Sequence, residues 1–139
     1  MLQRIIEQKI ARTIYSSNSK NNLDILNANH WKLMENIIRL LQPFEELTKR
    51  ASDDDVDLSF VIPAVNALQK YLAKTWKDSG VKTMKDELLN SVTERFGTIK
   101  EKKLYVLATV LNPQYKLAPF DIIDQNKTKF MLKEEVKLL

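Results

Sequence analysis

Residues 104–116 decide the fold, and they read LYVLATVLNPQYK. The first eight of these residues are apolar apart from Thr109, so a helix made from them has no polar face to turn toward water. We therefore expect a helix over residues 104–111 at the centre of the fold, with Leu107 and Leu111 among the most buried side chains. Asn112 and Pro113 should end it, because a residue before proline is pushed out of the α region and proline donates no backbone hydrogen bond.

Helical periodicity also fills the chain before this stretch. Leu2, Ile6, Ile10 and Ile14 repeat every four residues, which predicts an amphipathic helix ending near residue 17, followed by a polar loop over residues 18–22. A second helix should begin near Asn27 or Asn29, since either side chain can cap it. Pro43 then either kinks this helix or opens a new one as its first residue.

The acidic loop at residues 53–57 separates these helices from the next ones, and Asp57 or Ser59 can cap the helix that follows. Gly97 can end a later helix, and a last helical segment should follow the loop over residues 116–121. The expected buried stripes of the two intervening helices are Val61, Val65, Leu68 and Leu72, then Met84, Leu88, Val92 and Phe96. No stretch alternates with period two, so we predict a compact all-α bundle of five or six helices around residues 104–111.

Composition limits the function. At 139 residues the chain is expected to form one domain, and it contains no cysteine, which excludes disulfides, thiolate zinc sites and a cysteine nucleophile. The net charge is +4, and residues 71–139 carry the whole excess, with thirteen Lys/Arg against nine Asp/Glu. That mild basic bias suits a phosphate backbone or an acidic partner. No apolar run reaches transmembrane length, and the first residues are not typical of a signal peptide.

A family resemblance begins where the apolar stretch ends. The segment Leu111-Asn112-Pro113-Gln114-Tyr115-Lys116, with Phe120 after it, resembles the Leu-Asp-Pro-Arg-Tyr/Phe-Lys pattern of hAT-family transposases and of the host BED-zinc-finger proteins derived from them. It departs from that pattern at Asn112 and Gln114, where the family's Asp and Arg could form an ion pair. Further family-like blocks occur in the expected order: residues 1–8, Leu26 with Trp31, Pro43-Phe44 with Thr48, residues 59–63, and Arg95-Phe96-Gly97.

The resemblance implies a specific place in a larger protein. In this family an RNase H-like catalytic core is interrupted by a large all-α insertion, and this chain resembles that insertion. The metal-binding carboxylates, the BED zinc finger and the dimerisation segment have no matching segments here. The resemblance thus implies a fragment without catalytic residues, metal or cofactor. Its parent would be nuclear and bind DNA together with the rest of its own chain, and any homo-oligomer would form through regions outside residues 1–139.

Two aromatic residues could contact DNA. Trp31 could stack on an unpaired base near a cleaved transposon end, as the resemblance suggests, or it could be a partly buried side chain in the first turn of a core helix. Trp76 has the same two interpretations.

Four lysines flank the central helix, namely Lys100, Lys102, Lys103 and Lys116. They could bind phosphates or form a solvated edge. By contrast, the aspartates at 53–57 lack the spacing of a calcium loop, and His30 has no second ligand for zinc.

Two functions remain compatible with these observations. The chain is either a helical insertion that assists DNA binding and positioning, or a helical protein–protein interaction module retained in a domesticated protein. Whether the parent keeps the three catalytic carboxylates would separate them.

Overall fold

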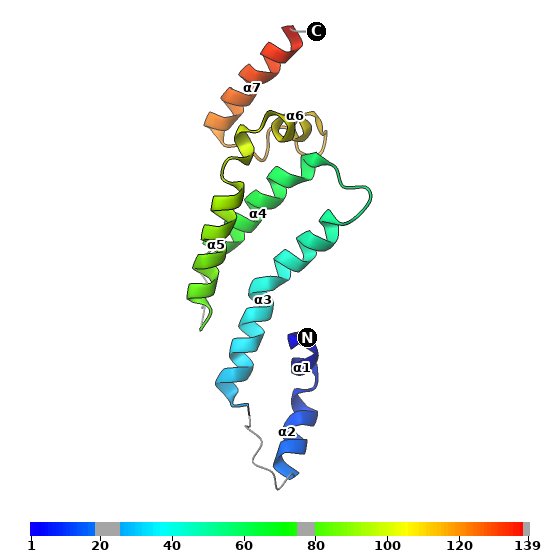
Figure 1. The fold of residues 1–139 in the computed structure, drawn as a ribbon, viewed down its shortest axis with the longest axis vertical. Helices are drawn as coiled ribbons and strands as arrows, with labels where there is room; N and C mark the ends of the chain where they lie inside the picture. Colours follow the sequence, from blue (N-terminus) through cyan, green and yellow to red (C-terminus); the bar gives the residue numbers. More distant parts are fainter. Residues whose placement is uncertain (19–25, 75–79, 138–139) are drawn as a thin grey trace.

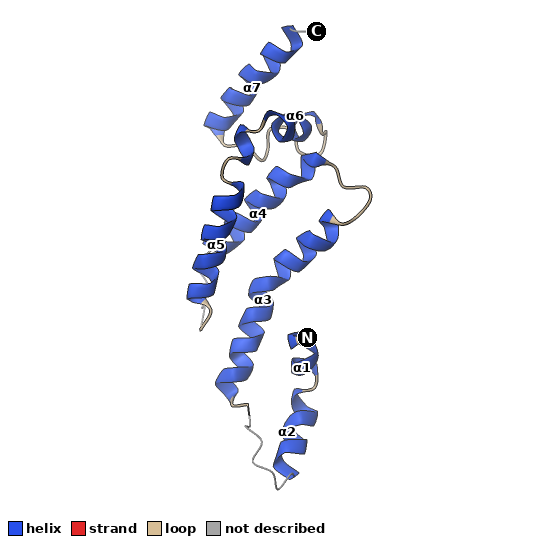
Figure 2. Ribbon diagram, in the orientation of Figure 1, coloured by secondary structure: helices blue, strands red, loops and turns tan. Residues whose placement is uncertain are grey.

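A computed structural model describes residues 1–18, 26–74 and 80–137, and over these residues the chain forms helices and turns without a strand (Figure 2). The all-α prediction is therefore confirmed. In chain order the elements are α1 (Leu2–Glu7), α2 (Lys9–Asn18), α3 (Ala28–Ala51), the 3-10 turn η1 (Leu58–Phe60), α4 (Val61–Ala73), α5 (Lys82–Phe96), the 3-10 turn η2 (Ile99–Glu101), α6 (Lys103–Leu111) and α7 (Ile122–Lys137).

These helices build an elongated molecule. Figure 1 shows α1 and α2 alongside α3, the pair α4 and α5 beyond them, α6 across the far end of that pair, and α7 projecting at the C-terminal end. The accessible surface is 10620 Å² for 16.2 kDa, whereas a compact monomer of this mass exposes about 7,500 Å². The expectation of a compact bundle is wrong, because the described helices follow one another along the long axis of the molecule in Figure 1 and leave a large surface exposed.

Helices α3, α4 and α5 enclose the first of two cores. Its buried members, here called the first core, are Leu40, Val65, Leu72, Val81 and Val92. Pro43 lies inside the continuous helix α3, which changes direction part-way along its length in Figure 1. Of the two predicted alternatives, the structure therefore agrees with a kink at Pro43 and not with a new helix that begins there.

A second core lies where α4, η2, α6 and the loop after α6 meet. Its buried members, here called the second core, are Ile62, Ile99, Val106 and Phe120, and Tyr105, Val110, Leu117 and Met131 pack around them. This core positions α6 and the lysines near its start.

Helix α6 spans Lys103–Leu111, close to the predicted bounds, and Asn112 after it is extended, with φ −74° and ψ 120°, as expected before proline. The predicted burial is wrong. Leu111 is 72% exposed and Leu107 is only partly buried, while Val106 and Thr109 are fully buried. Among the described elements α6 packs on η1, η2 and α4, and its outward side carries the exposed Leu104 and Leu111.

The N-terminal segment differs from the prediction as well. It forms two helices separated at Gln8, and α1 packs on α3 through partly buried side chains such as Ile5 and Ile6. Ile10 and Ile14 in α2 are 75% and 57% exposed. The four-residue repeat therefore marks one helical face correctly but overestimates how far along the chain that face is covered.

Helix ends follow the predicted capping chemistry. Asn27 caps α3 by accepting a hydrogen bond from the His30 amide (2.9 Å), and His30 Nδ1 accepts one from the Asn27 amide (3.4 Å). Gly97 ends α5, but its φ of −56° is right-handed. Glycine is needed there for space, because an added Cβ would lie 2.6 Å from the Thr93 carbonyl oxygen. Of the stripe predicted for α5, Val92 is buried, whereas Met84 and Phe96 are exposed.

Candidate nucleic-acid interface

Three of the candidate lysines meet at the start of α6. Lys100 belongs to η2, which the buried side chain of Ile99 anchors in the second core, and Lys102 and Lys103 follow at the first residues of α6. We call Lys100, Lys102 and Lys103 the lysine corner. No side chain caps α6 at this end, so its positive dipole end adds to the charge of the lysines.

Two of these lysines are paired with carboxylates of α7. The Lys100 ammonium lies 3.0 Å from Asp124 Oδ2, and both side chains are about 30% exposed. Lys103 pairs with Glu135. Among the described residues no carboxylate forms an ion pair with Lys102, which is exposed. Lys102 is therefore the member of the corner with the most freedom to meet a phosphate.

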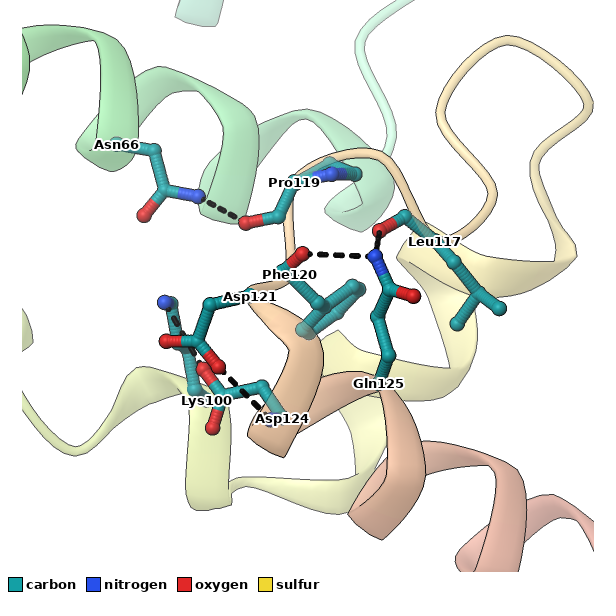
Figure 3. Close-up of polar contacts among 8 residues, drawn as sticks. All are labelled: Asn66, Lys100, Leu117, Pro119, Phe120, Asp121, Asp124 and Gln125. Atoms are coloured by element: carbon teal, nitrogen blue, oxygen red, sulfur yellow. Dashed lines mark hydrogen bonds and ion pairs between the residues drawn. The ribbon is translucent and has the colours of Figure 1, made fainter.

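The loop after α6 is fixed between α4 and α7, and it holds the corner in place. Figure 3 shows Asn66 of α4 donating to the Pro119 carbonyl (2.5 Å). Gln125 of α7 donates to the carbonyls of Leu117 (3.2 Å) and Phe120 (3.0 Å). Because these bonds set the position of α7, they also set the position of the carboxylates that hold Lys100 and Lys103.

Lys116 lies beyond the opposite end of α6. Its backbone is left-handed, with φ 50°, and its amide donates to the Asn112 carbonyl at 3.0 Å. A nine-residue helix is about 13 Å long, so Lys116 does not join the lysine corner. It is an exposed charge on the same end of the molecule.

Trp31 is buried, with 6% of its surface exposed. Its indole N–H donates to the Leu26 carbonyl (3.2 Å), and the Lys9 ammonium lies 5.4 Å from the ring centroid. In this conformation neither face of the ring is available to a base, so the interpretation as a core side chain is the one that fits. Helix α3 also begins at the end of the molecule away from α6 (Figure 1). Trp76 lies outside the described residues.

A polar network around the buried Ser59 joins η1 to the end of α6, and the residue pattern does not predict it. Asn112 Nδ2 donates to the Ser59 hydroxyl (2.6 Å), and that hydroxyl in turn donates to Asp57. Asp57 also caps η1 by accepting from the Ser59 amide at 2.9 Å. Since Ser59 already gives its proton to a carboxylate, its oxygen needs a donor. Asparagine at position 112 supplies that donor, and aspartate would not.

The acidic loop offers no metal site in the described residues. Asp53, Asp54 and Asp55 are exposed, and no group of three or more acidic or histidine side chains is gathered anywhere in the described parts of the chain. None of the described helices is long and apolar enough to cross a membrane. His30 acts as part of the α3 cap.

Helix α7 holds further basic residues that we did not single out from the sequence. Lys129, Lys133 and Lys137 recur every four residues, which places them on one face of the helix. Reading residues 122–137 with helical periodicity would have found this face.

A groove lies at the other end of α6. It has a volume of about 860 Å³ and its walls come from the end of α3, the acidic loop, η1 and the end of α6. The lining residues are Ala51, Val56, Asp57, Leu58, Phe60, Val61, Ala108, Leu111, Asn112 and Pro113.

Comparison with known proteins gives two human relatives and one from mouse. The chain is 30% identical over 141 residues to the human zinc finger BED domain-containing protein 4, an alignment that covers all of this chain and 12% of that protein. It is 30% identical over 124 residues to the human zinc finger BED domain-containing protein 6, covering 81% of this chain and 13% of the relative. The mouse protein of the same name is 29% identical over the same length. No family model and no solved structure matches. The chain spans about one eighth of the length of these relatives.

Proposed function

Because the chain belongs to the BED-zinc-finger proteins derived from hAT transposases, we propose that it is a helical insertion domain of such a protein and helps to position DNA. The ordered family-like blocks along the chain and its all-α fold support this role. The insertion supplies no catalytic carboxylates in this proposal, so any chemistry belongs to other parts of the parent protein. The nucleus is the compartment that fits a DNA-positioning role.

The observation that carries the proposal is the lysine corner. An uncapped helix start presents backbone N–H groups and a positive dipole end, and such sites bind phosphate oxygens. Lys102 stands at this helix start without a carboxylate partner among the described residues. A DNA backbone passing the corner would therefore meet both the amides and this ammonium group.

The expected binding is weak and independent of sequence. A phosphate must compete with Asp124 for Lys100 and with Glu135 for Lys103. Lysines on phosphates carry no base information. With a net charge of +4, we expect about two to four phosphate contacts from the slope of log affinity against log salt.

A fluorescence-anisotropy titration of labelled duplex DNA at low salt tests the role. Lys102→Glu with Lys103→Glu should weaken binding equally for unrelated sequences. The matched control is Lys32→Glu together with Lys70→Glu, which makes the same change of charge at exposed lysines of α3 and α4. Equal losses in the two double variants, or no binding by the unmodified chain, would contradict the proposal.

A second function is favoured by a different observation. Four large apolar side chains on α7 are more than 60% exposed, namely Ile122, Ile123, Phe130 and Val136. A phosphate backbone gives such side chains no partner, whereas a protein surface does. A protein–protein interaction module therefore remains the alternative, and the two functions use different faces of the α6–α7 end.

A further inference from the structure

Helix α7 has two faces of different chemistry. Successive residues turn by about 100° around a helix, so Asp124, Thr128, Met131 and Glu135 share the face that lies against the second core and the lysine corner. The opposite side, here called the outer face, carries the exposed apolar residues Ile122, Ile123, Phe130 and Val136 together with Lys129, Lys133 and Lys137. Asp124 and Glu135 point inward to their lysines, and the exposed Glu134 pairs with Lys137 at 2.8 Å. Lys129 and Lys133 form no ion pair among the described residues, so the outer face is apolar with a basic excess.

The groove at the end of α6 has the complementary chemistry. Leu58 and Leu111 line it and are 42% and 72% exposed, which is unusual for leucines that belong to a concave surface. Asp57 is part of its wall, and the exposed Asp53, Asp54 and Asp55 come from the same loop. The Arg50 guanidinium lies 4.8 Å from the Phe60 ring centroid and keeps its charge, but four aspartates outnumber it at this rim. The groove is therefore apolar with an acidic margin.

We propose that the outer face of α7 in one copy of the chain docks into this groove in a second copy. Apolar side chains on the helix would cover Leu58 and Leu111, and the lysines would lie against the aspartates. The chain exposes roughly 3,000 Å² more surface than a compact monomer of its mass, and a specific interface needs only about 1,200–2,000 Å². The proposal rests on the alternative function of protein–protein interaction and names a second copy of the chain as the partner. The experiment that tests it uses no DNA.

The charges argue against the simpler arrangement in which two α7 helices pair with each other. In that arrangement Lys129 and Lys133 of one copy would face the same lysines of the other, and like charges at a helix interface are unfavourable. When α7 docks into the groove, its lysines lie near aspartates instead of lysines. The contact also covers the apolar side chains of the outer face and of the groove. Nucleic acid would satisfy the lysines but leave the four apolar side chains in water.

The geometry has a consequence that can be measured. The contact is heterologous, because two different surfaces meet. In a dimer, the groove of one copy and the outer face of α7 in the other copy remain unused. A variant with a defective helix face still has a sound groove, and a variant with a defective groove still has a sound helix face. Each alone should be monomeric, but a mixture of the two should form a 1:1 dimer that cannot grow further.

Analytical ultracentrifugation of the whole chain over a range of concentrations tests this. The unmodified chain should associate, and Ile123→Asp with Phe130→Asp, or Leu111→Asp alone, should weaken association by about tenfold or more. Mixing these two variants should restore a dimer. All three positions are exposed, so circular dichroism should show unchanged helix content in both variants. The matched control is Ile10→Asp on α2, which is 75% exposed and outside both surfaces; it should associate like the unmodified chain.

Three results would overturn the proposal. The first is an unmodified chain that stays monomeric up to the highest concentration reached. The second is a Leu111→Asp variant that associates like the unmodified chain, as expected if α7 pairs with α7, or a mixture that remains monomeric although both variants are folded. The third is equal loss of association in the Ile10→Asp control. The DNA titration of the lysine corner can succeed or fail independently, because Lys102 lies on neither surface.

Discussion

The two cores differ in the elements that build them. The first core, between α3, α4 and α5, consists of aliphatic side chains such as Leu40 and Leu72 on long helices. The second core is assembled from the start of α4, a short helix, a 3-10 turn and a loop, and next to its apolar members it buries the hydroxyl groups of Ser59 and Thr109. Thr109 is fully buried while Leu111, two residues on, is 72% exposed.

This difference shows that the most apolar segment of a chain need not be its most buried one. Which side chains of α6 are buried depends on the edge that rests on η1 and α4. On that edge the Thr109 hydroxyl can be buried because it donates a hydrogen bond to the Tyr105 carbonyl at 2.8 Å. In the long helix α4, Val65 and Leu72 are buried as periodicity predicts, because α3 and α5 lie along it. In α5 only the part beside α4 follows the prediction, since Met84 and Phe96 near its ends are exposed. A short helix at the end of an elongated molecule does not lie between two long neighbours in this way.

The largest expected effect separates the two leucines. Leu40→Ala should lower the free energy of unfolding by about 2–5 kcal/mol, because it leaves a cavity in the first core. Leu111→Ala should change it by less than about 0.5 kcal/mol, because the side chain already faces solvent. Urea denaturation followed by circular dichroism measures both. If both variants lost the same free energy of unfolding, Leu111 would be a core residue and α6 would be the central helix.

The polar network of the second core should give the next largest effect. Asn112→Asp removes the donor to the Ser59 hydroxyl and places a second carboxylate near Asp57. Leaving this buried hydroxyl without its donor should cost about 1–3 kcal/mol. Adding Gln114→Arg should recover part of the loss, since it restores the pair of charges in the family pattern. A double-mutant cycle measures the recovery, and a fully additive result would show that residues 112 and 114 do not interact.

A smaller effect concerns the ion pairs at the lysine corner. Asp124→Asn frees Lys100 from a pair that is about 30% exposed, so the free energy of unfolding should fall by less than about 1 kcal/mol. The same change should strengthen DNA binding, because one more lysine becomes free to contact phosphate. The titration described above measures it. Unchanged or weaker binding would show that Lys100 does not contact DNA.

The smallest effect is expected on the exposed surface of α3. The Lys49 ammonium, 2.6 Å from the Glu45 carboxylate, lowers the pKa of Glu45, and Glu45 in turn raises the pKa of Lys49. The support that this pair gives α3 is therefore present above the ordinary Glu pKa and is lost as pH falls through the lowered value. At high pH this support is lost as the pH rises through the raised pKa of Lys49. An NMR titration of Glu45 should show its pKa rising in Lys49→Met, and an unchanged pKa would rule out the pair in solution.

Much of the fold could be predicted from the sequence, for identifiable reasons. The all-α class, the Asn27 cap, the Asp57 cap and the end of α6 at Asn112 each depend on local chemistry that a few neighbouring residues determine. The family resemblance also came from short ordered blocks.

Tertiary contacts account for what the sequence could not show. The exposure of Leu111, the burial of Ser59 beside Asn112, and the pairing of Lys100 with Asp124 each join segments distant in the chain or depend on a missing neighbour. For Trp31 both interpretations were open, because the residue pattern was the same whether or not Lys9 and Leu26 covered the ring.

Small-angle X-ray scattering tests the central claim, an elongated two-core molecule with uncovered faces, most directly. The chain carrying Ile123→Asp and Phe130→Asp, measured dilute, excludes any contribution from self-association. A compact domain of 139 residues has a radius of gyration of about 14 Å. The arrangement in Figure 1 predicts a radius clearly above that value and a distance distribution with an extended tail. A radius near 14 Å with a symmetric distribution would contradict it and would restore the compact bundle.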